Sequence, residues 1–152
     1  MALMEFDHMG MVVHDLDAAV EFFMALGFVR QGGAEISGPW MDRIIALRGA
    51  RARMVMVSAP DGSGKLELST FSEPAPEKDY PVLPANAHGL RHIAYRVANV
   101  EAVVEKARVA GYGLVGELVD YEGIFRLGYI RGPEGLIVEV AQPLWEDLAG
   151  SG

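Results

Sequence analysis

Apolar and polar residues alternate along the first part of the chain and then follow a helical period. Residues 6–13 alternate in side-chain character, as the residues of a strand with one buried face do. Asp15 then offers an N-cap, and apolar residues recur at helical spacing until Gly27: Ala18, Ala19, Phe22, Phe23 and Leu26. The pattern predicts a strand over 6–13 and a helix between Asp15 and Gly27.

The same plan occurs a second time along the chain. His8 is matched by His92, 84 positions later, and at the same offset Asp15 falls on Asn99 and Gly27 on Gly111. After each predicted helix come three segments of strand character separated by turns, which are 28–36, 51–59 and 65–71 in the first copy and 114–120, 124–131 and 136–141 in the second. Each copy therefore predicts the order strand, helix, strand, strand, strand.

Two segments interrupt this repeat. Residues 72–88 contain four prolines, which disfavour helix and interior strand and indicate a linker. Only the first copy has an insertion, at 38–47, for which we expect a short helix that either covers the mouth of a cleft or decorates the surface. We predict an α+β protein with one domain over 1–152, made of two modules, 5–71 and 89–142.

Four ionisable residues lie at repeat-related places on the predicted strands: His8, Glu67, His92 and Glu139. Because strand side chains alternate between faces, each of the four points away from the apolar face that its helix covers. A carboxylate flanked by apolar neighbours is costly on a sheet unless that face is wet, paired or metal-bound. Two imidazoles and two carboxylates from four strands suit a divalent ion such as Zn, Ni, Co, Mn or Fe. Taken singly, each could equally be a structural histidine or a solvated glutamate, and we expect exposed or structural roles for His14 and His88.

Composition and charge narrow the function classes. The formal net charge of −8 argues against a general affinity for nucleic acid or anionic membrane, since both need basic patches. The chain has no cysteine, which excludes disulfides and thiolate metal ligands and suits a reducing compartment. The sequence opens without the pattern of a signal peptide, and no apolar run approaches the roughly 20 residues that cross a bilayer. We expect a cytoplasmic protein that binds neither nucleic acid nor membrane.

Four motifs together resemble the vicinal oxygen chelate superfamily: Asp7–Leu16, Lys65–Leu68, Gly89–Val97 and Gly132–Val140. That superfamily includes glyoxalase I, methylmalonyl-CoA epimerase, extradiol dioxygenases and the fosfomycin and bleomycin resistance proteins. The resemblance implies paired βαβββ modules whose mixed sheet curls around a metal cleft. It also implies that His8, Glu67, His92 and Glu139 stand in the places of the family's four metal ligands.

For activity, the resemblance implies a metal-dependent lyase, isomerase or epimerase of the glyoxalase type. Such an enzyme transfers a proton next to a carbonyl group of a small oxygenated metabolite through a metal-bound enediolate. Glu139 is then the expected proton carrier, with Glu67 as its counterpart, and Glu35 is a candidate for the additional acid that epimerases use.

Two other functions stay open at this point. An extradiol-type iron dioxygenase would hold its metal by two histidines and one carboxylate. A non-catalytic drug-binding protein of the bleomycin resistance type would instead line a cleft with aromatic side chains, for which the candidates are Trp40, Phe71, Tyr80, Phe125 and Tyr129.

Proteins of this plan pair their sheet edges within one chain or across a homodimer, so we expect a homodimer with each site inside one chain or between two.

Overall fold

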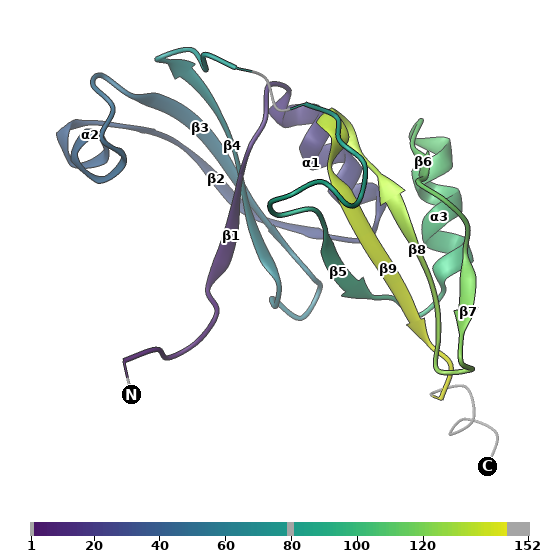
Figure 1. The fold of residues 1–152 in the computed structure, drawn as a ribbon. Helices are drawn as coiled ribbons and strands as arrows, with labels where there is room; N and C mark the ends of the chain where they lie inside the picture. The colour runs from purple at the N-terminus through teal and green to yellow at the C-terminus, as the bar shows by residue number, and fades with distance from the viewer. Residues whose placement is uncertain (1, 79–80, 146–152) are drawn as a thin grey trace. The chain divides into compact units, whose positions relative to one another are not determined.

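A computed structural model describes residues 2–78 and 81–145 of the chain (Figure 1). The chain divides into two units, 1–79 and 80–152, and each is described by itself. Among the described residues, no helix combines the length and apolarity that spanning a bilayer requires.

The first unit is a four-stranded sheet with two helices (Figure 1). In chain order its elements are β1 (His8–Val12), α1 (Leu16–Ala25), β2 (Val29–Ser37), α2 (Pro39–Ile45), β3 (Arg51–Ser58) and β4 (Lys65–Glu73). The strand order is β1-β4-β3-β2, with β1 parallel to β4 and the other pairs antiparallel. A parallel β1–β4 pair requires the chain to cross over between them, and α1 lies in that connection.

The apolar stripe of α1 forms the core of the first unit. Its buried residues are Leu16, Ala19, Phe22 and Phe23, and the sheet contributes Val55, Val57, Leu66 and Leu68. The helix begins at the predicted cap, where the backbone N–H of Ala18 donates to Asp15 Oδ1 at 2.9 Å. The chain leaves the helix through Gly27, whose φ of 105° is a conformation that favours glycine.

The insertion forms the expected short helix, α2. Met41 on this helix is buried in a small cluster with Ala50 and Ala52, against which Ile36 and Phe71 pack. Because side chains alternate along strands, Ala52 and its cross-strand neighbour Phe71 lie on the same face of the sheet as Glu67. The residues beneath α1 lie on the other face. Therefore α2 covers the face of the sheet opposite to α1, which is the face that carries Glu67.

The second unit repeats the arrangement with a five-stranded sheet. Its elements are β5 (Ile93–Arg96), α3 (Val100–Val109), β6 (Gly113–Leu114), β7 (Val119–Tyr121), β8 (Phe125–Arg131), the single 3-10 turn η1 (Pro133–Gly135) and β9 (Ile137–Pro143). The order is β5-β9-β8-β6, with β7 also pairing β8, and β5 runs parallel to β9. The cap of α3 is again the predicted one, since Ala102 N–H donates to Asn99 Oδ1 at 2.9 Å.

One predicted strand of the second unit is interrupted. The sequence predicts a continuous strand over 114–120, whereas β6 ends at Leu114 and β7 begins at Val119. Both pieces pair with β8, where Leu114 is opposite Ile130 and Val119 is opposite Leu127. The interrupted segment therefore has two more residues between its paired positions than β8 has. A Cβ at Gly128 of β8 would lie 2.8 Å from Leu118 Cδ2, so the interrupted segment packs into space that a side chain would occupy.

The predicted linker contains neither helix nor strand from Pro74 to Lys78 or from Pro81 to His88. Its second part is held to the second unit: Arg131 Nη1 donates to the carbonyl oxygen of Leu83 at 2.8 Å, and Val82 lies against Gly135. The linker therefore belongs structurally to the second unit from residue 81 onward.

Candidate metal centre

The first unit brings His8 and Glu67 together. His8 opens β1, and the parallel register of β1 and β4 sets Gly10 opposite Glu67, two positions past the histidine. His8 Nε2 lies 3.7 Å from Glu67 Oε2, with the side chains 38% and 33% exposed. Both side chains are therefore accessible to a small ligand while still in contact with each other.

The second unit brings His92 and Glu139 together in the same way. The parallel register of β5 and β9 sets Ala94 opposite Glu139, again two positions past the histidine. His92 Nε2 lies 3.2 Å from Glu139 Oε2, and the side chains are 36% and 21% exposed. The sequence repeat is thus also a repeat of strand register and of side-chain pairing.

Each pair has atoms suited to a divalent ion. Metal–nitrogen and metal–oxygen distances of about 2.0–2.2 Å place two neighbouring ligand atoms about 2.8–3.6 Å apart, for angles from octahedral to tetrahedral. The 3.2 Å separation of His92 and Glu139 falls in that range. The 3.7 Å separation of His8 Nε2 and Glu67 Oε2 is slightly longer than this range. A small rotation of the partly exposed Glu67 side chain would bring the two atoms into the range. The chemistry and spacing of both pairs fit a metal ion.

Each unit by itself supplies two such donors. Within the described ranges, no group of three or more histidine, aspartate and glutamate residues is placed to hold a metal ion.

The surroundings of the two histidines differ. Asp7 Oδ2 lies 2.5 Å from His8 Nδ1, and Asp7 Oδ1 lies 3.9 Å from Lys65 Nζ. The hydrogen bond with His8 and the charge of Lys65 together hold the pKa of the Asp7 carboxyl below its usual value. His92 instead lies against the ring of Tyr129, with ring centroids 4.9 Å apart.

Sequence reasoning missed Asp7 and Lys65 as neighbours of the candidate site, and it named Tyr129 only as an aromatic candidate for lining a drug-binding cleft. A signal for the first two was present, because the residues at the same repeat positions in the second copy are Arg91 and Ile137. The two copies match at the histidine but differ in charge at these neighbouring positions. Such a difference indicates that the neighbour has a role in one copy only. Tyr129 gave no such signal, since it lies opposite Glu139 only through the antiparallel register of β8 and β9.

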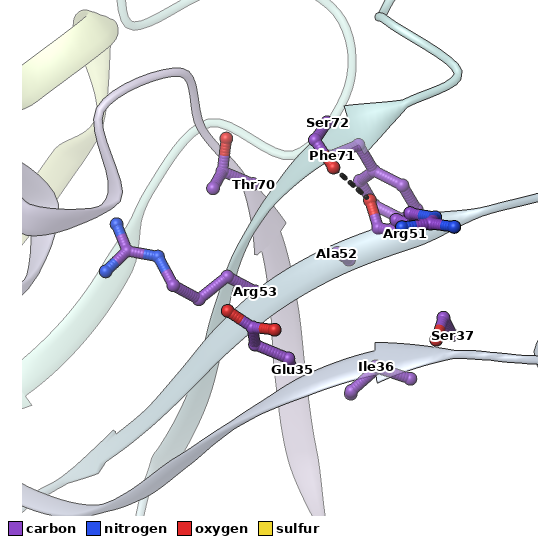
Figure 2. A pocket seen from close by; sticks show the side chains of 9 residues that line it. All are labelled: Glu35, Ile36, Ser37, Arg51, Ala52, Arg53, Thr70, Phe71 and Ser72. Atoms are coloured by element: carbon purple, nitrogen blue, oxygen red, sulfur yellow. Dashed lines mark hydrogen bonds between the residues drawn. The ribbon is translucent and has the colours of Figure 1, made fainter.

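A cavity of about 470 Å³ lies in the first unit, away from the His8–Glu67 pair. It is lined by 35–37 of β2, 51–53 of β3 and 70–72 of β4 (Figure 2). Arg53 on its wall pairs with Asp17 of α1 at 3.1 Å, so this wall belongs to the α1 side of the sheet. Glu35 is opposite Arg53 in the register of β2 and β3 and shares that side. The structure therefore places Glu35 on the face opposite to Glu67 rather than beside the pair.

The other candidate residues have varied surroundings. Trp40 is 52% exposed on α2, and Phe71 packs with the Met41 cluster. Phe125 lies edge-on to Trp145 with centroids 4.9 Å apart, whereas Tyr80 falls outside the described residues. His14 and His88 are exposed, as expected. Among the aromatic candidates that the structure describes, Tyr129 lies against the ring of His92.

Comparisons with known proteins agree with this architecture. The family model for the Glyoxalase/Bleomycin resistance protein/Dioxygenase superfamily matches residues 5–140. A crystal structure of a glyoxalase family protein from Bacillus cereus is 35% identical, with a TM-score of 0.90 over 95% of this chain and 99% of that chain. No protein of curated function matches the chain significantly.

More distant structures share the fold. The trypanothione-dependent glyoxalase I of Leishmania major is 20% identical, with a TM-score of 0.63 over 93% of this chain and 88% of that chain. An antibiotic-binding protein from Streptomyces sp. CB03234 is also 20% identical, with a TM-score of 0.61 over 94% of this chain and 98% of that chain. These likenesses confirm the predicted α+β fold class with two mixed sheets.

Proposed function

Because the chain belongs to the glyoxalase/bleomycin resistance protein/dioxygenase superfamily, we propose that it is a metal-dependent lyase or isomerase. It would move a proton next to a carbonyl group of a small oxygenated metabolite. The observation that carries the proposal is the duplicated contact between a histidine and a glutamate, His8 with Glu67 and His92 with Glu139.

The proposed metal centre uses both pairs. Two neutral imidazoles and two carboxylates offset the charge of a divalent ion, and the mixed nitrogen and oxygen set suits Zn, Ni, Co, Mn or Fe. One pair from a first unit and one from a second unit complete the set, either within one chain or across a homodimer. The partial exposure of all four side chains leaves room for water or substrate oxygens.

A divalent ion held there would act as a Lewis acid toward the negative charge that develops on a substrate oxygen when the neighbouring carbon loses its proton. Glu139 accepts that proton at a carboxylate oxygen. It is the less exposed of the two glutamates, at 21% against 33% for Glu67, which favours transfer to the substrate over loss to water. Glu67 holds the matching position in the first unit and is the counterpart that would return a proton.

Substitution of Glu139 by Gln tests this assignment. Glutamine keeps the size and an oxygen donor but cannot accept the proton, so we expect proton exchange to fall by about 100-fold or more while metal remains bound. Exchange is measured by proton NMR in D2O with a panel of α-hydroxy ketones and hemithioacetals, and bound metal is measured by mass spectrometry. Glu117→Gln, which removes an exposed carboxylate of the same unit, serves as the control. Full activity in metal-loaded Glu139→Gln would refute the assignment.

Any one of three results would contradict the proposed function itself. Protein that neither contains nor takes up a divalent ion would exclude the metal centre. Oxygen uptake with a catechol by the iron-loaded protein would indicate a ring-cleaving dioxygenase. Tight binding of aromatic compounds without turnover would indicate a binding protein, the function named for the antibiotic-binding neighbour.

A further inference from the structure

A chain of polar contacts surrounds the histidine of the first unit. Asp7 contacts His8 Nδ1 through one carboxylate oxygen at 2.5 Å, and its other oxygen lies 3.9 Å from Lys65 Nζ. Lys65 is opposite His8 in the register of β1 and β4, and Glu67, two positions further along β4, faces the other nitrogen of His8. The two imidazole nitrogens therefore have different carboxylate neighbours.

The two repeat positions are occupied by other residue types in the second unit. Arg91 stands at the repeat position of Asp7, and Ile137 stands at that of Lys65. The ring of Tyr129 is beside His92 instead. Both members of the Asp7–Lys65 contact are thus replaced together, although the histidine and the glutamate are retained.

We propose that Asp7 is a positioning residue for His8, an inference that rests on the proposed metal centre. By accepting a hydrogen bond from Nδ1–H, Asp7 orients the ring and leaves the lone pair of Nε2 directed toward Glu67. A carboxylate on the second ring nitrogen also makes an imidazole a stronger metal ligand. The first unit is therefore the half that holds the ion more tightly. The second unit, with no carboxylate at position 91, retains the glutamate that we assign to proton transfer.

Affinity for Zn²⁺ tests the consequence for the metal. The metal alone is titrated into metal-free protein in competition with a chromophoric chelator. Asp7→Ala should weaken binding by about tenfold, the lower end of the usual effect of such partners, because Asp7 is exposed. Asp7→Asn should give an intermediate loss, since the amide oxygen is a neutral and weaker acceptor. Glu5→Gln removes the same charge two residues away and should leave the affinity unchanged.

The protonation pattern of His8 tests the positioning without metal. Long-range ¹H–¹⁵N NMR spectra of the metal-free protein at about pH 8, above the usual histidine pKa, distinguish which ring nitrogen carries the proton. We expect the Nδ1–H form for His8 in the wild type and a mixture of both forms in Asp7→Ala. His92 should give the same signals in both proteins and is the internal control.

The two measurements separate the failure of this inference from the failure of the proposed function. Equal Zn²⁺ affinity in the wild type and Asp7→Ala, or an Nε2–H form of His8 in the wild type, overturns the role of Asp7 and leaves the proposed function standing. Failure of the wild type to bind Zn²⁺ and, in the same titration, Ni²⁺, Co²⁺, Mn²⁺ and Fe²⁺ overturns both.

Discussion

Ionisable side chains occupy both faces of the second sheet, and the face determines their surroundings. Glu139 shares one face with His92, where both side chains are partly exposed. Tyr95 has the opposite strand parity and lies on the face that α3 covers. Burial raises the pKa of Tyr95 to about 12, because the phenolate would lose much of its hydration there.

This pKa predicts a loss of stability in alkali. Below about pH 10 the phenol is protonated in both the folded and the unfolded chain. Between about pH 10 and pH 12 the unfolded chain releases the proton and the folded chain keeps it, so the free energy of unfolding decreases as pH rises. Urea unfolding at about pH 8 and pH 11 should show a smaller decrease in Tyr95→Phe than in the wild type. An equal decrease in both proteins would contradict the prediction.

The residues of the proposed site could be predicted from sequence, but their neighbours could not. Alternation along strands and the repeat suffice to place His8 and Glu67 on one face of their sheet. The contact of Asp7 with both His8 and Lys65 depends on the register of β1 with β4 and on side-chain rotamers, which the sequence pattern does not determine.

The two capped helices, α1 and α3, are the elements that the sequence predicts most completely. Asp15 and Asn99 cap them at repeat-related positions, each accepting from the N–H three residues later at 2.9 Å. An N-cap, an apolar stripe and a terminal glycine are local signals, so no knowledge of the tertiary fold is needed to find them.

Removal of one cap should therefore destabilise the second unit by a predictable amount. Asn99→Ala leaves the N–H of Ala102 without its side-chain acceptor and should lower the free energy of unfolding by about 1 kcal/mol, measured by urea denaturation. Asn99→Asp retains the acceptor oxygen and should preserve most of the stability. If the two variants were equally destabilised, the cap would not be the cause.

The strand that follows the helix is less predictable in the second unit than in the first, where β2 (Val29–Ser37) matches the prediction over 28–36. The pattern over 114–120 indicates a single strand, yet β6 and β7 are separate. The interruption depends on Gly128 of the neighbouring strand β8, where the absence of a side chain leaves space for Leu118. That glycine lies outside the interrupted segment, so a local reading of hydrophobic periodicity does not detect it.

At the scale of the whole molecule, the duplication places one histidine–glutamate pair in each unit. The sequence predicts which face of each sheet carries the histidine and the glutamate, and it indicates the family, because the four motifs are spread from Asp7 to Val140.

Metal binding should couple the two units energetically. A ligand that binds only the folded protein raises its stability, so Zn²⁺ should increase the thermal midpoint and a chelator should reverse the increase. If both pairs hold one ion, the stoichiometry is one ion per chain, and His8→Ala and His92→Ala each abolish the increase. Two ions per chain, with one retained in His8→Ala, would show that the pairs act independently.

The matched register of β1 with β4 and of β5 with β9 has an evolutionary consequence. In an ancestor assembled from two identical half-length chains, every mutation would appear on both sides of the symmetry axis. Fusion of the halves into one gene frees each copy to change alone. Such a fused protein can accumulate differences between its halves. The imidazole of the first half has an acidic neighbour where that of the second half has a basic one, and a phenol lies beside the second imidazole.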